Sequence, residues 1–181
     1  PSVRALYYEA MVEQGVHALK FGKAAWRANV FGRYIAQAAA EYLGGRFDAV
    51  TYVPVSWQRN AARGFDQARL LAQAAAKEWD AKAEPTLRKI RHNRPQSTLD
   101  DPRRRQANAA GAYRPLPWAR IAGRRFLLID DVITTGSTMS ACAGTLLEAG
   151  AASVVCASLA GGHPRKDPRQ AVCKERERLQ T

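Results

Sequence analysis

Two acids and a run of hydroxyl residues lie side by side in one segment of this 181-residue chain. Asp130 and Asp131 follow the apolar run Phe126-Leu-Leu-Ile129, which predicts a strand buried in a parallel sheet. In open α/β sheets, ligands bind at the carboxyl end of such strands. Carboxylates there accept hydrogen bonds from sugar hydroxyls or help to hold a metal ion. The pair is the first candidate for chemistry, the alternative being that Asp131 simply forms a turn.

The hydroxyl residues predict a cradle for a phosphate group. Residues 134–138 read Thr-Thr-Gly-Ser-Thr and lead into a segment with helical spacing of apolar residues. A helix N-terminus presents unpaired N–H groups and a partial positive charge, which suit an anion. Gly136 allows a close approach of the backbone, and further donors come from the hydroxyls of Thr134, Thr135, Ser137 and Thr138.

This cradle is not a Walker A loop, because the Gly-Lys-Ser/Thr ending is missing. Together with the two acids it predicts a site for a sugar phosphate. In the alternative interpretation, the segment is an ordinary strand–turn–helix with Ser137 as its N-cap.

Strands and helices alternate along the sequence, which predicts an α/β fold with a mostly parallel central sheet flanked by helices. Apolar periodicity predicts helices at Val3–Lys20, Ala25–Leu43, Phe65–Trp79 and Ser137–Ala149. Apolar and β-branched runs predict strands at Asp48–Val55, Arg125–Val132 and Ser153–Leu159, with short ones at Thr86–Arg91 and from Gly111. In the second helix, the spacing predicts one face formed by Val30, Tyr34, Ala38 and Tyr42.

The composition predicts one globular domain. Hydrophobic residues make up 46% and charged residues 24%, which excludes wholesale disorder. We expect no membrane span and no signal peptide, since no apolar run approaches about 18 residues and the first residues lack a basic start. The three cysteines form neither a disulfide framework nor a zinc signature, so we expect a cytoplasmic protein. We expect helices in 1–46, the core in 47–162 and a charged tail in 163–181.

Basic residues are concentrated in one part of the chain. The segment from Arg88 to Arg125 holds eleven basic residues and two acids, so it carries +9 of the net charge of +12. A concentrated excess predicts an anionic partner, such as phosphate groups, nucleic acid or an acidic protein. The alternative is a solvated basic loop. Within this segment, residues 92–108 lack periodicity and predict a long loop, which is often functional.

The stretch from Phe126 to Thr138 resembles the signature of type I phosphoribosyltransferases. Those proteins bind 5-phosphoribosyl-1-diphosphate with Mg²⁺. The resemblance implies that Asp130 and Asp131 meet the ribose hydroxyls, and contact a metal only indirectly, through Mg²⁺-bound ribose hydroxyls or water. It also implies that residues 134–138 hold the 5-phosphate, and that the N-terminal helices form a hood over the site.

Further motifs resemble the competence protein ComF family, which is linked to DNA uptake in natural transformation. They cover nearly the whole chain in order: Leu19-Lys-Phe-Gly22, Val53-Pro-Val55, Arg63-Gly-Phe-Asp-Gln-Ala68, Arg94-Pro-Gln96 and Arg105 through Tyr113. The chain departs from the family at Ser56, often a proline, and at Asp66, often an asparagine. The family's four-cysteine zinc module is also missing, either because this member has none or because it was trimmed.

The resemblance implies a diphosphate site after the first core strand, with Ser56, Arg59 and Arg63 binding the ligand. The loop 92–108 corresponds to one that closes over the substrate and supplies cations to the leaving diphosphate. Arg104 is our candidate there, although Arg94, Arg103 and Arg105 share its chemistry.

Two functions follow as hypotheses. In the first, the chain is a phosphoribosyltransferase of unknown acceptor, and Asp131 or Mg²⁺ stabilises an oxocarbenium-like transition state. In the second, the same site senses the sugar diphosphate without catalysis, while the basic segment binds single-stranded DNA or a competence helicase. Release of diphosphate separates the two.

Overall fold

Four parallel strands form the central sheet, in the order β1-β6-β5-β2. The computed structural model describes residues 2–7, 25–55, 66–90, 111–133 and 135–161. The strands are β1 (Ser2–Tyr7), β2 (Ala49–Tyr52), β5 (Arg125–Ile133) and β6 (Ser153–Gly161). The register aligns Leu127 with Val50 on one side and with Val155 on the other. The predicted parallel α/β sheet is confirmed.

Strand β5 lies inside the sheet, because it pairs on both sides and is covered on both faces. The side chains of residues 126–129 are fully buried. Leu127 and Ile129 belong to the core on one face of the sheet, and Phe126 and Leu128 to the core on the other. This alternation follows from the period of two along a strand.

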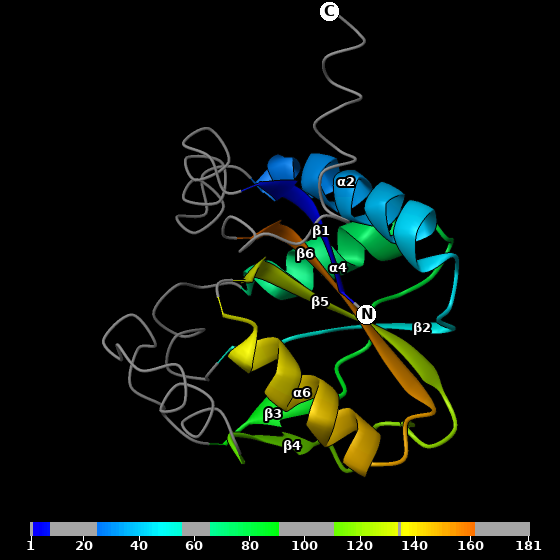
Figure 1. Ribbon diagram of the computed structural model, residues 1–181, viewed down its shortest axis with the longest axis vertical. Helices are drawn as coiled ribbons and strands as arrows, with labels where there is room; N and C mark the ends of the chain where they lie inside the picture. Colours follow the sequence, from blue (N-terminus) through cyan, green and yellow to red (C-terminus); the bar gives the residue numbers. More distant parts are fainter. Residues whose placement is uncertain (1, 8–24, 56–65, 91–110, 134, 162–181) are drawn as a thin grey trace, which may run out of the picture.

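Helices α2 (Ala25–Leu43) and α4 (Gln67–Lys77) cover one face of the sheet, as Figure 1 shows. Helix α6 (Ser137–Glu148) lies on the opposite face, together with the antiparallel pair of β3 (Leu87–Lys89) and β4 (Tyr113–Pro115). These bounds agree with the predicted helices and strands to within a few residues.

The face predicted for α2 is wrong in part. Val30, Tyr34 and Tyr42 are 42%, 47% and 50% exposed, and only Ala38 of the predicted stripe is buried. The buried stripe instead holds Ala28, Ile35, Ala39 and Leu43. Small residues decide this orientation, because Gly32 packs so closely on Ala74 of α4 that a Cβ atom at Gly32 would clash with it.

The start of the chain also differs from the prediction. Val3–Tyr7 belong to β1 and not to a helix, because their backbone pairs with the edge of β6, with Val3 aligned to Ala157. Residues 8–20 of that predicted helix and the tail 163–181 lie outside the described residues. Among the helices that the structure describes, none is both long and apolar enough to cross a lipid bilayer.

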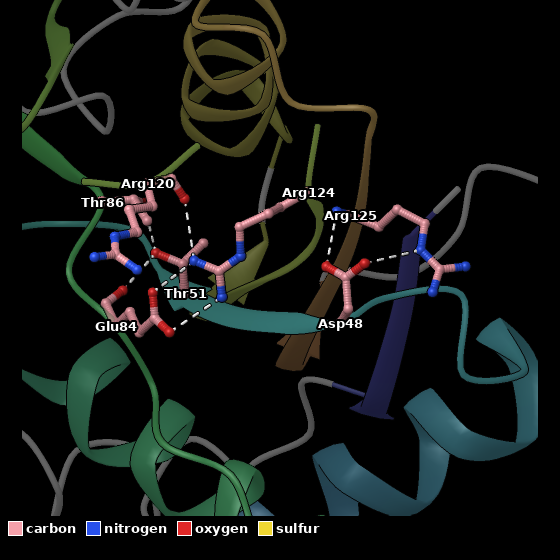
Figure 2. Close-up of polar contacts among 7 residues, drawn as sticks. All are labelled: Asp48, Thr51, Glu84, Thr86, Arg120, Arg124 and Arg125. Carbon is pink, nitrogen blue, oxygen red and sulfur yellow. Dashed lines mark hydrogen bonds and ion pairs between the residues drawn. The ribbon is translucent and has the colours of Figure 1, made fainter. Parts of the chain in front are cut away.

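A polar network attaches the segment before β3 to the sheet (Figure 2). The hydroxyl of Thr51 donates to the carbonyl of Glu84 at 2.9 Å and is 2.7 Å from the hydroxyl of Thr86. Both nitrogens of the Arg124 fork donate to the Glu84 carboxylate, at 2.9 and 3.1 Å. This network fixes the β3–β4 hairpin against the core, at the amino end of β5.

Candidate functional site

Asp130 and Asp131 lie at the carboxyl end of β5, where ligands bind in sheets of this kind. Each carboxylate accepts the backbone N–H of the following residue, at 2.9 Å for Asp130 and 2.8 Å for Asp131. Burial raises the pKa of Asp130 well above its usual value, and the neighbouring charge of Asp131 raises it further. Two acids held at this position are costly unless they interact with a ligand or a cation.

The two acids interact with each other and with groups from both faces of the sheet. The charge of Asp130 acts on Tyr113 and Cys142, which belong to the core beneath α6. The charges of both acids act on Asp66, the N-cap of α4, and the two side chains hydrogen-bond to each other. A ligand at this edge would therefore meet both carboxylates together.

Asp66 is a third acid of the site. Its carboxylate accepts the N–H of Arg69 at 3.1 Å, which caps α4. Burial raises the pKa of Asp66, hydrogen bonds with the backbone of Arg69 and Val55 oppose the rise, and the charge of Asp131 adds to it.

The N-terminus of α6 has the geometry of an anion cradle. Gly136 is the N-cap and has a φ of 76°, a left-handed conformation that L side chains rarely adopt. No side chain caps this helix end. The hydroxyls of Thr135 and Ser137 are 3.0 Å apart, and the Ser137 N–H is 3.5 Å from the Thr135 oxygen. The alternative interpretation, an ordinary strand–turn–helix with Ser137 as its N-cap, is therefore wrong, because Gly136 is the N-cap.

A buried tyrosine connects the hairpin to this cradle. Tyr113 of β4 is 5% exposed and hydrogen-bonds to Thr138 and Cys142 of α6. Burial raises the pKa of its phenol, and the charges of Cys142 and Asp130 contribute. The ammonium of Lys89 lies 5.6 Å from the centre of the Tyr113 ring. Burial likewise keeps the pKa of the Cys142 thiol high, so this cysteine is not an activated nucleophile.

The acids suit a hard cation that the ligand itself helps to hold. Among the described residues, no group of three or more His, Cys, Asp or Glu side chains is arranged to hold a metal ion. Mg²⁺ is commonly bound through one or two carboxylates, several waters and substrate phosphates. Asp130 and Asp131 fit that mode of binding through their oxygen atoms.

Comparison with known proteins assigns the chain to a family. A family model described as the phosphoribosyl transferase domain matches residues 61–180. The chain belongs to the phosphoribosyl transferase domain family. The match includes β5, the hydroxyl loop and α6, and it confirms the resemblance to type I phosphoribosyltransferases drawn from residues 126–138.

Curated relatives agree with the resemblance to the ComF family. The chain is 33% identical over 151 residues to the DNA utilization protein YhgH of Escherichia coli K12 and 34% identical over 148 residues to that of Salmonella typhimurium. Each match covers 77% of this chain, and the chain spans only 62% of the length of these relatives.

Solved structures with a similar fold include two bacterial proteins. One is a glutamine phosphoribosylpyrophosphate amidotransferase from B. subtilis, with a TM-score of 0.49, 24% identity and coverage of 73% of this chain and 25% of that one. The other is the protein TT1426 from Thermus thermophilus, with a TM-score of 0.45, 16% identity and coverage of 77% of this chain and 85% of that one.

The structure brings together part of the predicted site. Asp130, Asp131 and residues 135–138 meet at the carboxyl end of β5. The other candidates lie outside the described residues, so their placement stays a prediction: Ser56, Arg59, Arg63, Arg104 and Thr134.

Two arginines of the basic segment lie away from the acids, in the part of the segment that the structure describes. Arg124 and Arg125 lie at the amino end of β5, opposite to the acids, and pair with Glu84 and Asp48 (Figure 2). Hydrogen bonds and charge from Arg125 outweigh burial and hold the pKa of Asp48 below its usual value. Part of the +9 charge therefore stabilises the fold and is not available to an anionic partner.

Sequence reasoning missed three residues of the site: Asp66, Lys89 and Tyr113. Asp66 stood out as a departure from the family motif, but its nearness to Asp131 requires the packing of α4 beside β5. Tyr113 closes a family motif. Lys89 had no signal other than alternation in β3, where Leu87 is buried and Arg88 is exposed.

Proposed function

We propose that this domain binds 5-phosphoribosyl-1-diphosphate together with Mg²⁺. The observation that carries the proposal is Gly136, whose left-handed backbone opens the N-terminus of α6 directly after the two acids of β5. A phosphate in this cradle would accept N–H groups at the positive end of the helix and hydroxyls of the loop. A ribose that extends from it would reach Asp130 and Asp131.

The carboxylates act as acceptors for the ribose hydroxyls, which requires that they be ionised. Burial opposes ionisation of Asp130, and a bound cation would favour it. Mg²⁺, when bound, would neutralise charge on the diphosphate. The protein's own part is to hold the sugar between a phosphate cradle and two neighbouring carboxylates at the carboxyl end of β5.

We further propose that the bound ligand is a substrate. A nucleophilic acceptor would attack C1 of the ribose, its bond to C1 would form as the C1–O bond breaks, and the electron pair would leave with diphosphate. Asp131 is our candidate for electrostatic help at C1, and Arg104 for the leaving group. The acceptor class follows from an assay of diphosphate release with bases, amines or DNA ends in turn.

A binding role in DNA uptake is the second candidate, and one exposed segment favours it. Trp118 is 71% exposed, and the exposed Arg114 and Arg120 lie four and two residues from it. An exposed aromatic ring with cations close to it in sequence suits stacking on single-stranded bases with contacts to phosphates. The relatives named DNA utilization proteins are consistent with this role, and a helicase partner remains a prediction.

Isothermal titration of the domain with the sugar diphosphate tests the first proposal. We expect saturable binding with Mg²⁺ and much weaker binding in EDTA. If binding occurs but no acceptor leads to diphosphate release, the sensor hypothesis replaces the transferase hypothesis. If no binding occurs, the cradle interpretation is wrong.

A further inference from the structure

The β3–β4 hairpin carries a lysine to the same face of the sheet as the phosphate cradle. In β3, Leu87 is buried, Arg88 is exposed and Lys89 is half-buried. Lys89 is aligned with Tyr113 across the hairpin. Because side chains alternate along a strand, Lys89 shares the inner face with Leu87, whereas Arg88 points away from it.

Tyr113 connects this lysine to the first turns of α6. The Lys89 ammonium lies 5.6 Å from the centre of the Tyr113 ring, within the range of a cation–π interaction. The hydroxyl end of the same buried ring hydrogen-bonds to Thr138, the last residue of the hydroxyl loop, and to Cys142, one turn further along. One rigid side chain thus separates the lysine from the loop.

The electrostatics of this position favour a bound anion. Lys89 is half-buried as a residue, and it lies on the side of the sheet on which α6 presents its positive N-terminus. The charge of Lys89 reaches Cys142, as does the opposing charge of Asp130. A dianionic phosphate in the cradle would attract both the ammonium and the helix terminus.

We infer that Lys89 is a phosphate-binding residue of this site, which supplies the side-chain cation for the 5-phosphate of the sugar ligand, and that Tyr113 positions it. The inference rests on the proposed function and adds to it. The hydroxyl loop alone offers neutral donors, and Lys89 gives the cradle a charge that discriminates a phosphate monoester from a neutral sugar.

Titration with ribose 5-phosphate isolates this subsite, because that ligand carries no diphosphate. The variants are Lys89→Met, Lys89→Arg and the matched control Arg88→Met, which removes a charge from the other face of the same strand. We expect Lys89→Met to weaken binding of ribose 5-phosphate and of the sugar diphosphate about tenfold, the loss of about one charge-assisted contact. We expect Lys89→Arg to retain binding within about threefold and Arg88→Met within about twofold.

Two additional readouts separate binding from a structural role. Binding to Lys89→Met should depend less on salt than binding to the wild type, because one ion contact is lost. Inorganic diphosphate should bind Lys89→Met and wild type alike. Lys89→Gln replaces the methionine variant if that one does not fold.

The outcomes separate the inference about Lys89 from the proposed function on which it rests. If Lys89→Met binds ribose 5-phosphate as tightly as Arg88→Met does, the role of Lys89 is refuted and the proposed function stands. If Lys89→Met loses inorganic diphosphate alone, Lys89 serves the wrong phosphate and the inference is refuted. If the wild type binds neither sugar phosphate, both fail.

Discussion

The N-cap carboxylate of Asp66 lies within electrostatic reach of Asp131, although 65 residues separate them in sequence. α4 begins at the carboxyl edge of the sheet, where β5 also ends. Burial and the charge of Asp131 raise the pKa of Asp66, so the ionised carboxylate reduces the stability of the ligand-free fold. The carboxyl edge therefore concentrates negative charge. A bound ligand with its cation can reduce the repulsion between these carboxylates.

Replacing Asp66 by Asn should stabilise the ligand-free domain at neutral pH. Asparagine caps a helix as well as aspartate does, so the capping of Arg69 N–H is retained. A raised folded pKa means that wild-type stability is fully present below the unfolded pKa of 3.8 and declines as pH rises through the folded value. We expect the variant to melt about 2–4 °C higher at pH 7, the effect of about 1 kcal/mol in a chain of this size.

Thermal unfolding of both proteins in EDTA between pH 4 and pH 8 checks this. The difference in Tm should shrink towards pH 4. A variant that is less stable than wild type at pH 7 would show that the cap needs its charge and that Asp131 does not disfavour it.

Gly136→Val should abolish ligand binding. This loss should be larger than the destabilisation of the fold by the substitution explains. Valine at a φ of 76° costs about 1–2 kcal/mol of left-handed strain. Gly123 has a φ of 73° and, like Gly136, open space around a Cβ atom, but it lies before the amino end of β5. Gly123→Val is therefore a matched control. We expect similar losses in Tm, with binding lost only in Gly136→Val, and equal binding in both variants would rule out the cradle.

The Glu84–Arg124 pair should contribute to stability but not to ligand binding. Its side chains are 48% and 30% exposed, so solvent screening limits the coupling to about 0.5–1 kcal/mol in a double-mutant cycle. The hydrogen bond from Arg124 lowers the pKa of Glu84, so the contribution is present above about pH 4.5 and is lost as pH falls through the folded value. Alanine variants at both positions, measured by urea unfolding at pH 7 and pH 3, test this. Coupling that persists unchanged at pH 3 would contradict it.

Salt dependence separates a DNA-binding role of the basic segment from a catalytic one. If the segment binds single-stranded DNA through about six phosphates, the log–log slope of affinity against salt should be about −4. Replacing Arg103, Arg104 and Arg105 by Ala should make that slope about two units less steep, and Trp118→Ala should weaken binding without changing the slope. A triple variant that keeps its DNA affinity but slows diphosphate release would assign the arginines to catalysis. Fluorescence anisotropy with labelled oligonucleotides provides the measurement.

Much of the fold could be predicted from local sequence. The apolar run 126–129 predicted a strand that is buried on both faces, and the structure has one there. The predicted bounds of α6 and α2 agree with the structure to within one residue. The face of α2 could not be predicted, because the aromatic stripe with Tyr34 looked more hydrophobic than the alanine stripe around Ile35. Close packing of Gly32 on α4 selects the stripe of small residues, and that contact is nonlocal.

The candidate site could likewise be predicted only in part from the sequence. Asp130, Asp131 and Gly136 could be found because they are contiguous with a strand and a helix. Asp66, Lys89 and Tyr113 come from other elements, and only the packing of α4 and the β3–β4 hairpin around β5 brings them to the site. The N-terminal strand β1 was missed because its pairing partner, β6, is about 150 residues away.

Calorimetry of the sugar diphosphate with wild type and with the Asp130→Asn/Asp131→Asn double variant tests the central claim most directly. Asparagine retains the size of each side chain and removes both charges at the carboxyl end of β5. The account predicts Mg²⁺-dependent binding to wild type and at least tenfold weaker binding to the double variant, since hydrogen bonds to charged groups contribute about 1.5–3 kcal/mol each. Equal affinity of the two proteins, with both folded by circular dichroism, would contradict the role of the acids in holding the ribose.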